Sequence, residues 1–399
     1  MCFPYERQWS QHMKKEVPPI IALVGILLAL TLVQILFWRG LLGGPTHLRA
    51  GMGGGGAQPP SKAAVPVGLP EVSVTTLAGR PDPGYRDGEG DRALFDGPVS
   101  VAVGGKGVVY LADSRNHSVR VVSAEGEVTT LAGAQGEPGH VDGPPREARF
   151  SAPAGVAVAS DGRVFVADTG NHRIRCITPG GLVSTYAGAE TPRDGAGRSV
   201  GGYRDGPAAQ AQFCYPVGLA VDEQGVLYVA DAGNHSIRRI SRAGQVSTLP
   251  TSGAGELKTP TELALAPGNR IWVADSPQGT LWVGPRDGPL KQWHAPEGEE
   301  SFAAPAGLAV LGKGSAQPGV YVADAGNHCL WRLQGDRLTL VAGEQGVSSY
   351  GWEDGRGNRA QFSSPVGLAG APSGDLYIAD FGNNCLRRVT FATEDTEAD

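Results

Sequence analysis

The chain has 399 residues, including 60 Gly and 30 Pro, and 41% of its residues are hydrophobic. This hydrophobic content supports a packed core and excludes wholesale disorder, while the Gly and Pro content indicates many turns. The net charge is −6, but residues 1–70 carry +4, so the remainder carries −10. A domain this acidic is a poor general binder of nucleic acid, and five Cys do not make a disulfide scaffold.

The amino-terminal region predicts one membrane span. Residues 17–38 contain no charged side chain and follow a short tail, 1–16. The apolar part has the length that a helix needs to cross the hydrocarbon core, about 30 Å. We expect a retained signal anchor; a cleaved signal peptide, with its shorter apolar core, is the alternative. Basic residues before the span slightly outweigh those after it, which favours an extracytoplasmic location for the rest of the chain.

A linker is expected over residues 39–71, where Gly and Pro are frequent and no motif with catalytic chemistry occurs. Such a composition is typical of a flexible tether stiffened by prolines. At the other end, residues 392–399 are acidic and predict a disordered tail.

Between these segments one unit is repeated six times. Each unit has a short apolar run ending in Ala-Asp, and these aspartates are Asp113, Asp168, Asp231, Asp275, Asp324 and Asp380. Gly, Asp and Asn turns divide each unit into about four short strands, and no helical period is seen beyond residue 70. Four-stranded units repeated in this way predict a β-propeller, so the fold class is all-β, with six blades over residues 72–391.

The expected blades are residues 98–133, 153–188, 216–250, 260–293, 305–343 and 365–391. The last unit stops after its third strand, and an additional fourth-strand sequence, "VTTLAG" at 74–79, precedes the first unit. We therefore predict that residues 72–79 complete the sixth blade, which joins the two ends of the domain and removes exposed edges.

The sequences "VADTGNHRIRCI" and "VADAGNHSIRRI" resemble the NHL repeat, and the resemblance extends over about residues 72–391. It is strong in blades one, two, three, five and six, whereas blade four has Gln278-Gly279 in place of Asn-His. The resemblance implies a six-bladed propeller that serves mostly as a binding platform. Some relatives with this architecture are lyases or calcium-dependent lactonases, so the fold alone does not choose a function.

The repeated Asp-x-x-Asn-His turns have two interpretations, a set of His ligands or bases and a structural turn. A turn is needed in every blade but a ligand site in only one, so we interpret these residues as structural. They are Asp113, Asn116, His117, Asp168, Asn171, His172, Asp231, Asn234, His235, Asp324, Asn327, His328 and Asp380.

The long loops between blades share an aromatic-x-Asp-Gly pattern, followed by a Phe expected to pack between blades. In propeller geometry these loops lie on the same face as the repeated turns, and loops on a rigid scaffold commonly bind partners. A purely structural role for the loops is the alternative. The predicted binding residues are Tyr85, Arg86, Tyr203, Arg204, Trp352 and Glu353.

Signals for catalysis are weak. Glu262 is the sole acid at its level of the innermost strands, and one carboxylate does not make a calcium site. A catalytic rim would require Glu262 to converge with His140 and His294, the two propeller histidines outside the repeated turns. Disulfides between Cys329 and Cys385 or between Cys176 and Cys214 need close Cα atoms, for which the sequence offers no basis.

Together these features predict a membrane-anchored, non-catalytic binding platform outside the cytoplasm. The expected partner is a protein, a peptide or a surface polymer, with no nucleic acid, cofactor or metal. The alternative function is an extracytoplasmic lyase or hydrolase acting on a small substrate. RNA binding, known for some cytoplasmic NHL proteins, disagrees with the charge and the expected location.

Overall fold

The computed structural model describes residues 71–195, 197–253, 255–295, 301–344 and 350–392. The predicted tail 1–16, the predicted span 17–38 and nearly all of the predicted linker lie outside these ranges, as does the acidic tail from residue 393. Within the described ranges no helix has the length and apolar character needed to cross a membrane.

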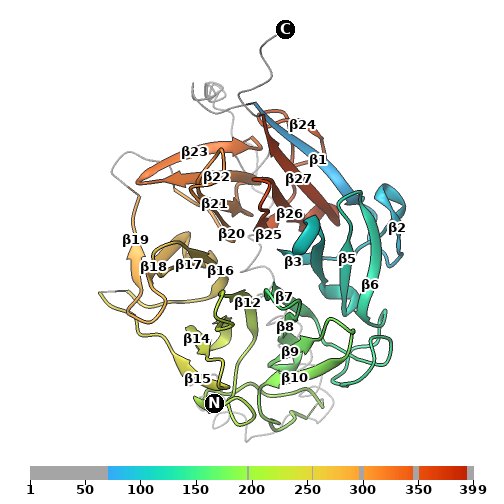
Figure 1. Ribbon diagram of the computed structural model, residues 1–399, viewed down its shortest axis with the longest axis vertical. Coiled ribbons are helices and arrows are strands. Elements are labelled where there is room, and N and C mark those ends of the chain that lie inside the picture. Colours follow the sequence, from blue (N-terminus) through green and yellow to red (C-terminus); the bar gives the residue numbers. More distant parts are fainter. Residues whose placement is uncertain (1–70, 196, 254, 296–300, 345–349, 393–399) are drawn as a thin grey trace, which may run out of the picture.

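Six antiparallel sheets are arranged around a central axis, as Figure 1 shows. The innermost strand of each sheet contacts the innermost strand of the next, so that the ring closes. The described part of the chain contains no α-helix, only seven 3-10 turns. The prediction of an all-β, six-bladed propeller is therefore confirmed.

Blades one to three have similar strands. Blade one contains β3 (Pro98–Val103), β4 (Val109–Asp113), β5 (Ser118–Val122), β6 (Glu127–Gly133) and a short fifth strand, β2 (Gly88–Glu89). Blade two contains β7 (Pro153–Val158), β8 (Val164–Asp168), β9 (Arg173–Ile177) and β10 (Val183–Ala187). Blade three contains β12 (Pro216–Val221), β13 (Leu227–Asp231), β14 (Ser236–Ile240), β15 (Gln245–Thr248) and a fifth strand, β11 (Gly206–Pro207).

Blades four to six complete the ring. Blade four contains β16 (Pro260–Ala266), β17 (Arg270–Asp275), β18 (Thr280–Pro285) and β19 (Lys291–Trp293). Blade five contains β20 (Pro305–Leu311), β21 (Gly319–Asp324), β22 (Cys329–Gln334) and β23 (Arg337–Ala342). Blade six contains β25 (Pro365–Gly370), β26 (Leu376–Asp380), β27 (Cys385–Phe391), β1 (Val72–Gly79) and a fifth strand, β24 (Gly355–Arg356).

The ring is closed by the first strand of the domain. β1 pairs antiparallel with β27, with Val74 opposite Val389, so the amino-terminal strand becomes the fourth strand of blade six. In Figure 1, β1 in blue lies beside β27 in red. This pairing confirms the ring closure predicted from the additional fourth-strand sequence at 74–79, and it joins the two ends of the propeller.

Small residues on the innermost strands are required by the approach of neighbouring blades. A Cβ on Gly155 would lie 1.9 Å from the carbonyl oxygen of Val217, and one on Gly307 would lie 2.2 Å from that of Val366. No side chain fits at such distances, which explains the Gly at this position in four of the six blades. One residue earlier, Val99, Ala154, Val217, Ala306 and Val366 are buried and belong to one hydrophobic cluster.

Candidate functional site

The end of the second strand in each blade carries a buried aspartate whose contacts are those of a turn. In blade two, Oδ1 of Asp168 accepts the backbone N–H of Ser151 at 2.7 Å. Nδ2 of Asn171 donates to Oδ2 of Asp168 at 2.9 Å and to the carbonyl oxygen of Gly139 at 2.7 Å. Blades one, three and six repeat these contacts, so the aspartate and asparagine join the turn to the preceding loop.

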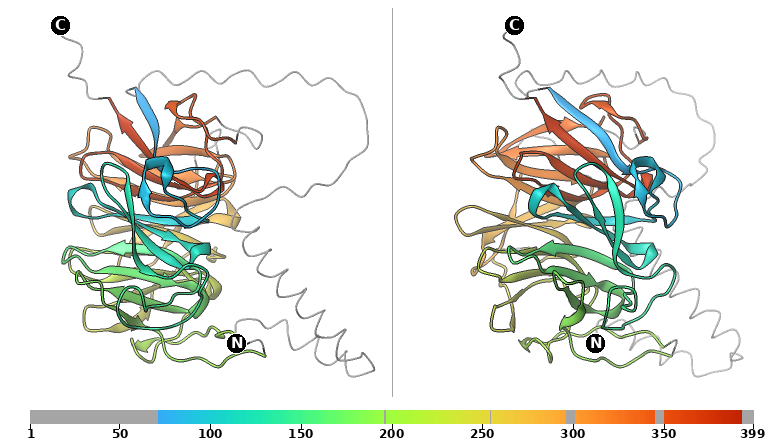
Figure 2. Two further views of the ribbon diagram at one scale, coloured as in Figure 1. Left: turned by 90° about the vertical axis from the view of Figure 1, so that its right-hand side faces the viewer. Right: turned by 45° about the vertical axis from the view of Figure 1, so that its right-hand side comes forward.

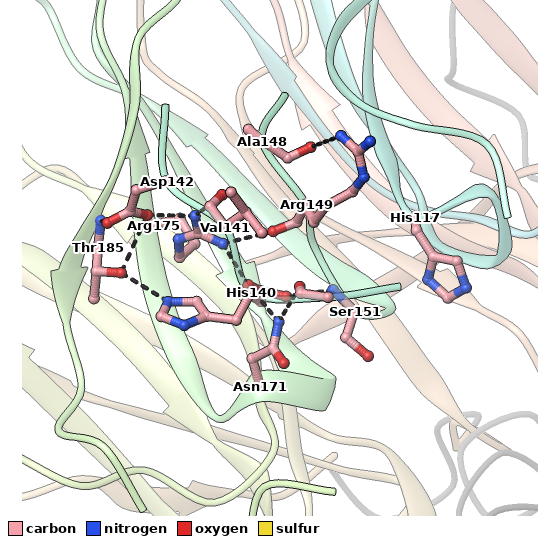
Figure 3. Close-up of polar contacts among 12 residues, drawn as sticks. His117, His140, Val141, Asp142, Ala148, Arg149, Ser151, Asn171, Arg175 and Thr185 are labelled. Atoms are coloured by element: carbon pink, nitrogen blue, oxygen red, sulfur yellow. Dashed lines mark hydrogen bonds and ion pairs between the residues drawn. The ribbon is translucent and has the colours of Figure 1, made fainter. Parts of the chain in front are cut away.

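A fully buried arginine on the third strand lies at the centre of the same four blades. Arg175 donates from Nη1 to Asp168 at 2.8 Å and from Nη2 to Asp142, the aspartate of the aromatic-x-Asp-Gly loop. It also donates to the carbonyl oxygens of Arg149 and Val141 (Figure 3). Arg120, Arg238 and Arg387 make the equivalent contacts in blades one, three and six. The arginine therefore joins two aspartates and two loop carbonyl groups.

The loop aspartate also holds the fourth strand of its blade. In blade two, Oδ2 of Asp142 accepts the backbone N–H of Thr185 at 3.0 Å, and Oδ1 accepts its hydroxyl group at 3.3 Å. Asp87, Asp205 and Asp354 bind Thr130, Thr248 and Thr76 in the same way. We name the set of strand-end aspartate, buried arginine, loop aspartate and threonine the arginine clamp.

Aromatic rings enclose the guanidinium group of the clamp. In blade three the Cζ atom of Arg238 lies 5.1 Å from the ring centre of Phe213 and 4.8 Å from that of Tyr203. The Nε atoms of all four clamp arginines are buried without a hydrogen-bond partner. The attraction between the cation and the aromatic faces offsets part of that cost. Phe95, Phe150, Phe213 and Phe362 are all fully buried.

Burial and pairing act in opposite directions on the clamp aspartates. Burial raises the pKa of Asp168 to about 6, against Arg175 and the hydrogen-bond donors that favour the carboxylate. The pKa of Asp113, Asp231 and Asp380 is raised to about 6 for the same reason. These aspartates are therefore ionised at neutral pH and are used as structural partners of arginine.

Blades four and five lack the clamp. Trp282 and Trp331 stand where the other blades have arginine, and both are buried. Without a guanidinium partner, Asp275 accepts the backbone N–H groups of Lys258 and Thr259. Asp324 accepts those of Ala303, Ala304 and Asn327. The ring thus contains four clamped blades and two with a different polar core.

The predicted binding residues lie on loops of three different blades rather than in one cluster. The hydroxyl group of Tyr203 lies 3.0 Å from Oγ1 of Thr248, that of Tyr85 lies 3.0 Å from Oγ1 of Thr130, and the indole of Trp352 donates to Thr76 at 3.2 Å. Because these threonines are on the fourth strands, the aromatic residues lie toward the outer edges of blades three, one and six. His140 holds the equivalent place in blade two, 2.9 Å from Thr185.

The charged neighbours of these aromatic residues contribute mainly backbone groups. The carbonyl oxygens of Arg86, Arg204 and Glu353 each accept a hydrogen bond from the clamp arginine of their blade. The Arg86 side chain also donates to the carbonyl oxygen of Arg92. All three side chains are exposed. Sequence reasoning missed the clamp arginines, although an Arg seven residues after the strand-end Asp in four units was a usable signal.

The three residues required for a catalytic rim do not converge. Glu262 lies on β16, the innermost strand of blade four, and is 8% exposed. His140 lies at the outer edge of blade two, and His294 follows β19, the outermost strand of blade four. Among the described residues, no group of three or more His, Cys, Asp or Glu side chains could hold a metal ion. Burial raises the pKa of Glu262 to about 8, so its carboxyl group is protonated at neutral pH.

The four cysteines of the described ranges are buried and none forms a disulfide, so neither of the pairings considered from the sequence occurs; they are Cys176, Cys214, Cys329 and Cys385. The two Asn-His-Ser sequences place Asn116 and Asn234 in repeated turns. Nδ2 of each asparagine is used in two hydrogen bonds, to an aspartate and to a loop carbonyl group. A glycan on either nitrogen would require the turn to break.

Four of the six blades are similar to the NHL repeat. Residues 95–122, 150–177, 213–240 and 362–388 match the NHL repeat, and these segments are the clamped blades one, two, three and six. Each match begins at the buried Phe and includes the clamp arginine. Blade five, in which the resemblance was also expected to be strong, is not among these matched segments. That blade keeps Asn327-His328 but has Trp331 in place of the arginine.

Two relatives illustrate the similarity. NHL repeat-containing protein 2 of Bos taurus is 27% identical over 353 residues, which are 75% of this chain and 47% of the relative. Protein SUPPRESSOR OF QUENCHING 1, chloroplastic, of Arabidopsis thaliana is 34% identical over 167 residues, which are 39% of this chain and 15% of the relative. The chain therefore spans less than half the length of these relatives.

Solved structures share the fold. An auxiliary nutrient binding protein from Bacteroides thetaiotaomicron has a TM-score of 0.61 at 17% identity, with 81% of this chain and 77% of that chain covered. A gluconolactonase from Xanthomonas campestris has a TM-score of 0.54 at 15% identity, with 84% and 99% covered. Because a binding protein and an enzyme share this architecture, function has to be argued from the residues of this chain.

Proposed function

We propose that this chain is a non-catalytic binding platform, anchored in a membrane by residues 17–38, that presents its NHL propeller outside the cytoplasm. Its partner is a protein, a peptide or a surface polymer. The anchor and its orientation rest on the uncharged stretch 17–38 and the basic residues before it.

Exposed aromatic side chains on rigid supports are the observation that carries this proposal. Tyr203 is 56% exposed, Tyr350 64% and Trp352 45%, and all lie in the loops that lead into a blade. The rings of Tyr203 and Trp352 are held by hydrogen bonds to Thr248 and Thr76. Rigid aromatic residues lose little conformational entropy on binding and are enriched at the energetic centres of interfaces.

These side chains share one end of the propeller. Each loop follows the fourth strand of one blade and runs to the innermost strand of the next, on the side of the repeated turns. Of the large hydrophobic residues that are exposed in the described ranges, only Leu182 lies at the other end, in the turn between β9 and β10. The two ends are seen edge-on in Figure 2.

The polar residues that repeat in the four clamped blades support binding rather than catalysis. The aspartates, asparagines and arginines of the clamped blades donate to and accept from one another and from loop backbone groups. Glu262, His140 and His294 are separated between the centre and the outer edges of the ring. A binding role uses the exposed loop side chains and leaves these structural contacts undisturbed.

The experiment is a crosslinking capture from intact membranes with the full-length chain, followed by mass spectrometry. The test variant is Tyr203→Ala/Arg204→Ala, and Leu182→Ala at the opposite end is the matched control. Since Tyr203 packs on Arg238, thermal stability is measured for each variant. Arg204→Ala and Glu353→Ala, whose side chains are exposed, separate binding from folding.

A species captured by the wild type and by Leu182→Ala, and lost with Arg204→Ala at unchanged thermal stability, supports the proposal. If the Tyr203→Ala/Arg204→Ala variant keeps both capture and stability, the predicted binding residues are wrong. Turnover of a small cyclic or peptidic substrate by the wild-type chain would favour the lyase or hydrolase alternative.

A further inference from the structure

The last residue of the repeated turn in one blade can bind the backbone at the start of the following blade. Where the following blade is clamped, this contact joins the two blades. Nδ1 of His117 accepts the backbone N–H of Ala152 at 3.0 Å, and Nδ1 of His172 accepts that of Tyr215 at 2.9 Å. Nδ1 of His328 accepts that of Ser364 at 2.9 Å. These bonds span the junctions between blades one and two, two and three, and five and six, and each donor directly precedes the proline of an innermost strand.

A histidine nitrogen accepts a hydrogen bond only when it carries no proton. At His172 the state of the ring follows from two contacts, since Nε2 lies 3.1 Å from the carbonyl oxygen of Ser199, to which it must donate. The ring is therefore neutral, with its proton on Nε2. A second proton on Nδ1 would face the N–H of Tyr215, so that attraction would become repulsion between two donors.

The other three junctions lack this acceptor histidine. Between blades six and one, Oδ1 of Asn384 accepts the N–H of Gly97 at 2.9 Å. His235, between blades three and four, faces the carbonyl oxygen of Lys258 and acts as a donor. Between blades four and five the position is Gly279, which has no side chain. Only an amide or a neutral imidazole fills the accepting position.

We propose that the propeller is an acid-sensitive ring in which protonation of His117, His172 and His328 releases three blade junctions while the Asn384 junction stays closed. Two of the released junctions lie at the carboxy-terminal ends of the loops that carry Tyr203 and Trp352. The third proposed binding loop, with Tyr85, ends at Gly97 and is held by Asn384. Insofar as these loops bind a partner, this consequence rests on the proposed function; the release of the junctions does not.

Burial of the three histidines favours their neutral form. The groups in contact with His172 are uncharged, the ring of Tyr215 at a centroid distance of 4.5 Å and the Ser199 carbonyl. Arg173, the next residue, interacts with Glu190, Asp168 and Asp142. Asp324 faces His328 and favours its protonated form, and Arg115 near His117 is paired with Asp96. Burial dominates, and it lowers the pKa of His172 to about 4 and lowers those of His117 and His328.

The sign of the effect follows from these directions. A histidine whose pKa is lower in the folded state stabilises the fold above its ordinary pKa of 6.5. That contribution is lost as the pH falls through the lower, folded value. For His172 the interval from 6.5 to about 4 corresponds to a loss of protection on the order of 100-fold at its junction.

The experiment is residue-resolved amide hydrogen exchange on the full-length chain in lipid nanodiscs between pH 7.5 and 4, normalised to intrinsic exchange rates. Protection of the Tyr215 amide is compared with that of Gly97 in the same sample. In the wild type we expect the Tyr215-to-Gly97 ratio to fall on the order of 100-fold at acid pH. Global unfolding would instead lower both protections together.

Two substitutions exchange the chemistry of the junctions. His172→Asn keeps an acceptor in a left-handed backbone position that Asn tolerates, so Tyr215 should stay protected at acid pH. Asn384→His should make Gly97 acid-sensitive. The proposal is overturned if the wild-type ratio is independent of pH, or if His172→Asn loses protection at Tyr215 as the wild type does. Because the readout needs no partner, such a failure leaves the binding proposal standing.

Discussion

Removal of one clamp arginine tests the energetic account of the blades. In the variant Arg238→Met the packed volume of the side chain is largely kept, while four hydrogen bonds are lost. These bonds reach Asp231 at 2.6 Å, Asp205 at 2.7 Å, and the carbonyl oxygens of Gln212 and Arg204 at 2.9 and 2.8 Å. Asp231 is fully buried and would lose its only ion-pair partner.

The expected magnitude follows from the buried charge that remains. Removing one partner of a buried ion pair costs about 3–5 kcal/mol, a large part of the roughly 5–15 kcal/mol that stabilises a folded domain. For a domain of this size each kcal/mol lowers the melting temperature by about 2 °C, so we expect a decrease of about 6–10 °C.

Thermal and urea unfolding of the purified chain measure this effect. Arg239→Met is the matched control, because Arg239 is the next residue of β14 and is only half-buried; we expect it to cost under about 1 kcal/mol. Adding Asp231→Asn to Arg238→Met should recover part of the loss, since no unpaired charge is then buried. The reasoning is refuted if Arg238→Met is as stable as Arg239→Met.

Three further predictions concern the buried Glu262 on the innermost strand of blade four, the closure of the ring and the repeated turns. Burial raises the pKa of Glu262 to about 8, so its contribution to the free energy of unfolding is full below its ordinary pKa of 4.5 and is lost as the pH rises through 8. Within that interval the loss is about 1.4 kcal/mol per pH unit. In urea unfolding at pH 5–8, the stability of Glu262→Gln should therefore decline less steeply than that of the wild type. Deletion of residues 1–79 removes β1 and with it Thr76, the partner of Asp354. The unfolding of this variant in calorimetry should be less cooperative than that of the wild type, whereas deletion of residues 1–70 should preserve cooperativity. Equal behaviour of the two variants would contradict the closure of the ring by β1. Asn116 and Asn234 should carry no glycan when the full-length chain passes through the secretory pathway of eukaryotic cells. A mass shift on glycosidase treatment that disappears in Asn234→Asp would show that the turn opens.

Local patterns were enough for the architecture because every blade repeats them. The six Ala-Asp strand ends, the turns after them and the small residues on the innermost strands are adjacent in sequence, and each reports on its own blade. The pairing of β1 with β27 could also be predicted, because the last unit lacked a fourth strand and an unmatched copy preceded the first unit. An alternative that stayed open, the disulfides, depended on distances between blades.

The sequence by itself determined the number of blades, the strand pattern and the place of ring closure, since these follow from short-range periodicity and turn chemistry. Only the tertiary structure decided what the repeated polar residues do. Arg238 joins Asp231, seven residues before it, to Asp205, thirty-three residues before it, and His172 accepts an N–H from the following blade. Such partners are chosen by how blades and loops pack in three dimensions, and the physical reason is that a buried charge or an unpaired backbone group must find its partner wherever the fold places one.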